Sequence, residues 1–136
     1  MQLDPSAFVA DSELLQALEK QSTPVDCAAD RVLFRQGEAA DGLFILQIGE
    51  VTLTMDSLAG QTILSIETRP GSLLGLPALL GGQPYSLTAV ARAAAQVGYI
   101  ARAEFTAIMQ SCPELGFKIL QVLAAEVSAA RRAISQ

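Results

Sequence analysis

The sequence predicts a mainly β protein, a sandwich or roll of about eight strands with one helix before it and two helices after it. Glycines, alone or in pairs, interrupt the middle of the chain at short intervals, at positions 37, 42, 49, 60, 71, 75, 81, 82 and 98. The segments between them are short and rich in Val, Ile, Leu, Phe and Thr, which is typical of strands joined by turns. Both ends of the chain instead carry apolar residues at helical spacing.

The composition restricts the classes of function. At 136 residues the chain has the size of one domain, and its 51% apolar and 17% charged residues are typical of a folded protein. The net charge of −5 argues against nucleic-acid binding, which usually needs a basic surface. The chain has no histidine, which excludes a Ser-His-Asp or Cys-His nucleophile system and histidine-rich metal sites.

Nothing in the sequence indicates export or membrane insertion. The N-terminal stretch has acidic residues where a signal peptide would be basic, and no apolar run approaches the ~18 residues needed to span a bilayer. Cys27 and Cys112 lie far apart and form no C-x-x-C pattern. We therefore expect a cytoplasmic protein with two free, buried or half-buried thiols and no membrane partner.

The N-terminal segment predicts one helix over residues 6–20. Leu14 and Leu18 are one helical turn apart, and Asp4 or Ser6 can cap the start. The helix should end before Pro24, because proline disfavours helical backbone at the preceding residue.

Two segments in the middle show the alternation of half-buried strands. Residues 51–55 alternate apolar and polar, and in the next strand Leu64 and Ile66 fall on the side opposite Ile63, Ser65 and Glu67. Residues 56–61 make a plausible hairpin loop between them, with Gly60 supplying a positive φ.

The last part of the chain predicts two helices, residues 103–110 and about 114–134, with Pro113 starting the second. Six residues of the long helix step by 4, 3, 4, 3 and 4, as in a heptad seam: Gly116, Leu120, Leu123, Val127, Ala130 and Ile134. Such a seam could pair with a second copy of the chain, or it could pack on the chain's own β-roll. We favour the dimer, because the part beyond Glu126 extends past what the roll should need to cover.

Three stretches, in order, carry a family resemblance: residues 35–51 (R-Q-G-E-A-A-D-G-L-F-I-L-Q-I-G-E-V), residues 71–89 (G-S-L-L-G-L-P-A-L-L-G-G-Q-P-Y-S-L-T-A) and residues 97–115. Together the span from about 24 to 134 resembles the cyclic-nucleotide-binding domain of catabolite-activator-type and FNR-type regulators and of protein kinase A regulatory subunits. The resemblance implies a double-stranded β-helix, a jelly-roll-like β-roll. It implies an N-terminal helix (1–22), a β-roll (23–102) with a phosphate-binding cassette at 71–89, and C-terminal helices (103–136), the last suited to dimerisation.

The resemblance also implies where a ligand would bind. In the family a cyclic nucleotide lies inside the barrel, where backbone amides and an arginine of the cassette meet its phosphate and a glutamate meets its ribose. The matching positions in this chain are Gly75, Leu76, Pro77, Ala78, Tyr85, Ser86, Leu87 and Thr88. Leu76 stands at the glutamate position and Tyr85 at the arginine position. Losing two hydrogen bonds to charged groups, at about 1.5–3 kcal/mol each, predicts binding weaker by a hundred-fold or more.

We therefore expect a non-enzymatic regulatory or interaction module that does not bind cyclic AMP or cyclic GMP in the usual way and needs no cofactor. It would act as a homodimer or through a protein partner of its C-terminal helix. The alternative is a sensor that binds a cyclic nucleotide or another small anion in the barrel, with Tyr85 donating one neutral hydrogen bond and Arg69 or Arg92 lending a cation. Related regulators continue into a helix-turn-helix domain, whereas this sequence stops at Gln136, so direct binding to nucleic acid is not expected.

Overall fold

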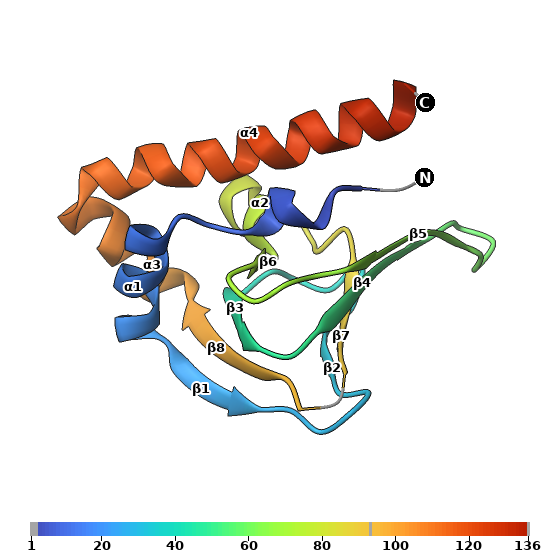
Figure 1. Cartoon of the computed structure of the whole chain (residues 1–136), viewed down its shortest axis with the longest axis horizontal. Helices are drawn as coiled ribbons and strands as arrows, with labels where there is room; N and C mark the ends of the chain where they lie inside the picture. The colour runs from blue at the N-terminus through green and yellow to red at the C-terminus, as the bar shows by residue number, and fades with distance from the viewer. Residues whose placement is uncertain (1–2, 93, 136) are drawn as a thin grey trace.

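Two four-stranded antiparallel sheets face each other, and helices cover one side of the molecule (Figure 1). The computed structural model describes residues 3–92 and 94–135; residues 1, 2 and 136, at the outer ends of the predicted segments 1–22 and 103–136, lie outside the described residues. The predicted class, a β-roll of about eight strands with flanking helices, is confirmed.

Each sheet is built from strands that are distant in the chain. The first sheet has the order β1 (Thr23–Asp26), β8 (Gln96–Ala101), β3 (Gly42–Ile48), β6 (Leu73–Leu74). The second sheet has the order β2 (Val32–Phe34), β7 (Thr88–Ala91), β4 (Val51–Asp56), β5 (Thr62–Glu67). Every neighbouring pair within these two sheets is antiparallel.

The side chains form two cores. The first lies between the sheets and includes Leu46, Leu53 and Ile66. The second lies between the outer face of the first sheet and the helices, and Leu43 and Ile45 of β3 belong to it. Because successive side chains of a strand point to opposite faces, β3 contributes to both cores.

The N-terminal segment forms two helices, so the prediction of one continuous helix over 6–20 is wrong. A short 3₁₀-helix, η1 (Pro5–Phe8), is followed by α1 (Ser12–Gln21). Asp4 accepts the amide of Ser6 and caps the first, and Asp11 accepts the amide of Leu14 and caps the second. Between them the backbone is extended and pairs with the residues before β6, through bonds such as the Ala10 amide to the Gly71 carbonyl at 3.0 Å.

The β4–β5 hairpin forms as predicted and projects from the body of the molecule (Figure 1). Leu64 and Ile66 face the core, whereas Ser65 and Glu67 are exposed. The loop is closed by a hydrogen bond from the Ser57 amide to the Gln61 carbonyl, and Gly60 has the expected positive φ of 83°.

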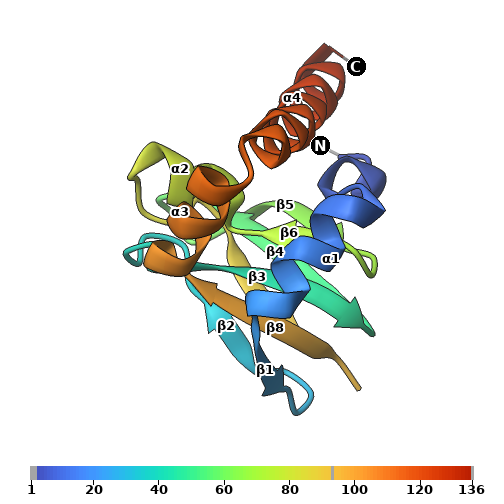
Figure 2. The same ribbon diagram turned by 90° about the vertical axis from the view of Figure 1, so that its left-hand side faces the viewer.

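Two helices complete the chain, α3 (Arg102–Ser111) and the long α4 (Pro113–Ser135), which lies across the top of the roll (Figures 1 and 2). The buried face of α4 includes Leu115, Ile119, Val122 and Ala129. Within the described residues, no helix is both long enough and apolar enough to cross a bilayer.

The sequence analysis favoured a dimer because the part of α4 beyond Glu126 was expected to extend past the β-roll. The structure corrects this reason. The 3₁₀-helix η1 lies beneath the C-terminal half of α4 (Figure 1), and Phe8 and Ala129 belong to the same core cluster. The part of α4 beyond Glu126 therefore has a function in this chain, which is to cover η1 and the end of the β-roll.

Candidate functional site

The predicted cassette forms a strand end, a sharp turn and the short helix α2 (Leu76–Gly81). The turn depends on Gly75, whose φ of 91° lies in the left-handed region. A Cβ at this position would lie 2.7 Å from the ring carbon Cε1 of Tyr85, so a side chain has no room here. The glycine thus brings the backbone of the cassette against the aromatic ring.

Next to the cassette lies a small cavity of about 40 Å³. Its lining comes from the second sheet, the cassette, η1 and α4: Phe8, Phe34, Leu53, Gly75, Pro77, Ala78, Tyr85, Ser86, Leu87 and Glu126. Six of the eight residues predicted from the resemblance are among them. A volume of about 40 Å³ corresponds to roughly three water-sized spheres, far less than a nucleotide occupies.

Tyr85, which the sequence analysis matched to the family's arginine, fills part of the barrel interior. Its ring stacks on Phe34 with 3.9 Å between the centroids, and its hydroxyl donates a hydrogen bond of 2.7 Å to the carbonyl of Gly42. Burial raises the pKa of this hydroxyl above its ordinary value. Since the single hydroxyl proton is directed to Gly42, Tyr85 does not supply the neutral hydrogen bond to a phosphate that the sequence suggested.

Leu76 and Thr88, the other two predicted residues, do not line the cavity. Leu76 is fully buried in the core between sheet and helices, and the Thr88 hydroxyl accepts a hydrogen bond from the amide of Gln36 at 2.9 Å. The structure thus assigns Leu76 a packing role and Thr88 a role in tying the residues after β2 to β7.

Four lining residues were not predicted: Phe8, Phe34, Leu53 and Glu126. Glu126 is the polar residue among these four. Its Oε2 atom is buried and has no hydrogen-bond partner among the described residues. Burial raises the pKa of this carboxyl to about 8. One signal could have revealed it: Glu126 continues the 4-3-4-3 spacing of residues 115, 119, 122 and 129, and is charged where these are apolar.

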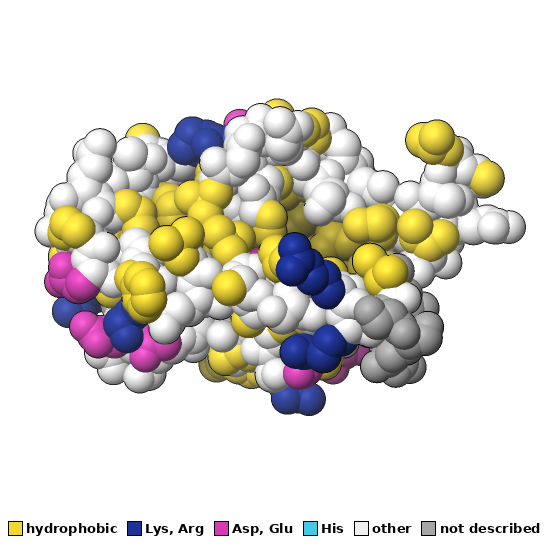
Figure 3. Space-filling model, turned by 90° about the horizontal axis from the view of Figure 1, so that it is seen from above, with side chains coloured by type: hydrophobic (Ala, Val, Ile, Leu, Met, Phe, Trp, Pro, Cys, Tyr) yellow, Lys and Arg dark blue, Asp and Glu magenta, His cyan; other side chains and the backbone are white. Residues whose placement is uncertain are grey.

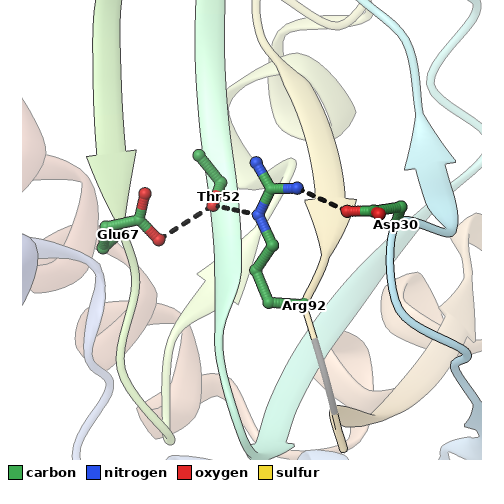
Figure 4. Close-up of polar contacts among 4 residues, drawn as sticks. All are labelled: Asp30, Thr52, Glu67 and Arg92. Carbon is green, nitrogen blue, oxygen red and sulfur yellow. Dashed lines mark hydrogen bonds and ion pairs between the residues drawn. The ribbon is translucent and has the colours of Figure 1, made fainter.

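Arg92, considered above as a source of positive charge, belongs to another site. Its Nε donates to the Thr52 hydroxyl at 2.8 Å, and one terminal nitrogen lies 2.7 Å from Asp30 (Figure 4). The Thr52 hydroxyl in turn donates to Glu67 at 2.8 Å. These contacts link Arg92, the residue that follows β7, to β4 and β5. Glu67 also raises the pKa of Glu50 through a shared hydrogen bond and like charge. Neither Arg92, Arg69 nor any other Lys or Arg of the described chain lines the cavity.

The outward face of α4 carries a stripe of exposed apolar side chains. Figure 3 looks down on this side of the molecule and shows hydrophobic side chains gathered in a band across it. Phe117, Leu120, Val127 and Ile134 are 65%, 60%, 49% and 69% exposed. Of the six predicted seam residues, Leu120, Val127 and Ile134 belong to this exposed stripe, while Gly116, Leu123 and Ala130 are half-buried at its edge. The seam is thus one residue out of phase with the face that packs on the β-roll.

The comparison with known proteins agrees with this architecture. The model of the cyclic nucleotide-binding domain family matches residues 24–112. The chain therefore belongs to the cyclic nucleotide-binding domain family.

Three relatives illustrate the range of this similarity. A cyclic nucleotide-gated potassium channel of Mesorhizobium japonicum is 28% identical over 113 residues, which are 83% of this chain and 28% of the channel. The catabolite activator protein of Thermus thermophilus superimposes with a TM-score of 0.81 at 21% identity, covering 97% of this chain and 62% of that one. A cyclic nucleotide-binding-like protein of Brucella abortus superimposes with a TM-score of 0.59 at 32% identity, covering 72% and 84%.

The chain thus spans less than a third of the channel and less than two thirds of the catabolite activator protein. At 21% identity the latter shows the fold alone. These similarities establish the family and the fold, and the ligand has to be argued from this chain's own residues.

Proposed function

We propose that this domain is a non-enzymatic regulatory and interaction module that dimerises through α4 and does not bind cyclic AMP or cyclic GMP in the usual way of its family. The observation that carries the proposal is the exposed stripe of Phe117, Leu120, Val127 and Ile134. A large apolar surface of this kind on a water-exposed helix indicates an interaction site. Its heptad spacing suits the same helix of a second copy.

The cassette supports the second half of the proposal. A cyclic nucleotide carries a phosphate, and burying that charge requires a cation or several donors. No Lys or Arg of the described chain lines the cavity, and the Tyr85 hydroxyl is already bonded to Gly42. Among the described residues the polar side chains at the cavity are Glu126, Ser86 and Tyr85, which offer a phosphate no positive charge.

The dimer can be tested by sedimentation velocity over a hundred-fold range of protein concentration. The wild-type protein should sediment as a dimer that dissociates on dilution, and Leu120→Asp should be a monomer. Gln61→Asp adds the same charge at an exposed position of the β4–β5 hairpin loop, away from α4, and should stay dimeric. A wild-type monomer at every concentration, or equal behaviour of the two variants, contradicts the proposal.

The alternative is a sensor of a cyclic nucleotide or another small anion, and one observation favours it. Gly75 keeps the left-handed conformation that starts α2, and no side chain caps that helix end. Calorimetric titration with cyclic AMP and cyclic GMP to millimolar concentration separates the two functions. Saturable binding supports the sensor, and the absence of heat supports the interaction module.

A further inference from the structure

Glu126, one of the residues that line the cavity, carries a carboxyl group that the proposed function does not use. Glu126 lies on α4 between the apolar residues Val122 and Ala129, and its Oε2 is buried without a hydrogen-bond partner in the described chain. A buried polar group without a partner destabilises the folded protein, and a charged one does so more strongly. Such a group calls for an explanation, and a ligand that supplies the missing partner is one.

The surroundings of Glu126 define what that ligand must carry. Most of the lining is carbon, including the rings of Phe8 and Phe34 and the side chain of Leu53, and no cation is present among the described lining residues. An anion would meet a carboxyl group and no compensating charge. A neutral donor would satisfy one hydrogen bond, whereas an ammonium group would add the attraction of opposite charges in a poorly solvated site.

The shape of the cavity sets the size of the ligand. About 40 Å³ has room for roughly three water-sized groups, so the cavity encloses the short end of a chain rather than a whole molecule. Ser86, an exposed residue, is part of the lining, so a larger molecule could place one end inside and leave the rest in solvent. The aromatic rings near the carboxyl are surfaces that also attract cations.

We propose that this cavity binds the aminoalkyl end of a small organic amine, whose ammonium group pairs with Glu126 and whose carbon chain lies against Phe8, Phe34 and Leu53. The site is independent of the proposed dimer interface, because Glu126 is on the buried face of α4 and the exposed stripe is on the other. A bound amine would nevertheless add a contact between α4 and the β-roll at Glu126, which directly precedes Val127 of the exposed stripe.

The test compares three molecules of nearly equal size: n-propylamine, 1-propanol and propionate, titrated into the whole protein by calorimetry at pH 8.5. A four-atom ligand binds no tighter than roughly tens of micromolar, so concentrations extend to tens of millimolar. Propylamine should bind at least ten-fold more tightly than propanol, and propionate should not bind. Equal affinity for the amine and the alcohol, or no binding of the amine, overturns the proposal.

Two variants assign the binding to the carboxyl. Glu126→Gln keeps the size of the side chain and should lose at least ten-fold in affinity for propylamine. Glu114→Gln, an exposed acid in the first turn of the same helix, should bind like the wild type. Equal affinity in all three proteins would overturn the assignment.

A measurement on the wild-type protein remains decisive even if Glu126→Gln does not fold. The carboxyl carbon of Glu126 is followed by NMR from pH 5 to pH 9 with and without saturating propylamine. Pairing with an ammonium group must lower the pKa of Glu126 from about 8, and the affinity for the amine must rise between pH 6.5 and 8.5. Tyr85, the other titratable residue of the lining, has its pKa raised by burial and keeps its proton throughout this range. A pKa of Glu126 that the amine leaves unchanged contradicts the proposal, while sedimentation without amine tests the dimer separately.

Discussion

The hydroxyl of Tyr85 donates a 2.7 Å hydrogen bond to the carbonyl of Gly42, joining two segments 43 positions apart in the chain. The bond connects the cassette to the first residue of β3, which is the central part of the first sheet. Tyr85 therefore ties the cassette to the first sheet.

Tyr85→Phe should destabilise the protein by about 1 kcal/mol, because a buried carbonyl loses its donor while the stacking on Phe34 is kept. The free energy of unfolding from urea titrations measures this effect. Tyr99→Phe, at the half-buried end of the same row of aromatic rings, is the matched control and should change stability less. Equal losses of unfolding free energy in the two variants would show that the bond to Gly42 does not stabilise the protein measurably.

Gly75→Ala should destabilise the protein by about 2 kcal/mol or more. The new methyl group meets Tyr85 at 2.7 Å, and an L side chain is strained at a φ of 91°. Gly82→Ala separates the two effects, since its φ is 64° and nothing lies within 4 Å of the added Cβ. The control should cost about 1 kcal/mol, the backbone part alone. If both variants unfold at the same urea concentration, the close approach of Gly75 and Tyr85 is of no energetic importance.

Local signals predicted the fold well. Glycine turns, alternation in β5 and Pro113 at the start of α4 each act over a few residues, and the structure confirms them. The N-terminal helix was the exception. Its residues have helical spacing, but the backbone from Val9 to Ala10 pairs with Gly71 and Ser72, a tertiary contact that no local pattern reveals.

The candidate site was harder to predict because neighbouring faces of α4 look alike in the sequence. Leu120, Val127 and Ile134 repeat as a heptad, and so do the residues one position earlier, so periodicity alone cannot tell which face is buried. Glu126 lacks a hydrogen-bond partner because it lies on the face of α4 that is buried, and periodicity alone does not identify that face. The orientation of Leu76 away from the cavity likewise depends on how α2 sits on the first sheet, which the motif does not encode.

Arg92→Gln should raise the pKa of Glu50 further. That pKa is already above its ordinary value because Glu67 shares a hydrogen bond and a like charge with it, and the positive charge of Arg92 acts in the opposite direction. The titration of the Glu50 carboxyl carbon by NMR measures the change. Arg92→Lys keeps the charge and should leave the pKa of Glu50 near its wild-type value; a rise of the same size in both variants would show that charge is not the cause.

Arg92→Gln should also reduce the free energy of unfolding by about 1–2 kcal/mol, mostly because the bond to the buried Thr52 hydroxyl is lost. Asp30→Asn removes only the exposed partner of Arg92 and should cost less than about 0.5 kcal/mol. Urea titrations of the two variants distinguish the buried contact from the surface ion pair. A loss as large in Asp30→Asn as in Arg92→Gln would show that the ion pair, rather than Thr52, stabilises this side of the roll.

Stability should fall as the pH rises from about 4.5 to about 8, because of Glu126. In the folded protein burial keeps this carboxyl protonated up to a pKa of about 8, whereas in the unfolded chain it ionises near 4.5. The folded state therefore binds more protons in this window, and the free energy of unfolding decreases with pH by up to about 5 kcal/mol. The loss is complete once the pH exceeds the folded pKa.

Thermal unfolding of wild type and Glu126→Gln across pH 4.5–9 checks this, since the variant has no group to ionise at that position and its curve should be flatter. Asp4 and Asp11 have pKa values lowered by their capping hydrogen bonds, so their contributions are lost only in more acidic solution. Glu126→Leu should be more stable than the wild type at pH 9, because an apolar side chain there leaves no buried charge. Parallel pH curves for wild type and Glu126→Gln would mean that the carboxyl reaches solvent, and with that the reason for an ammonium partner in the cavity would be gone.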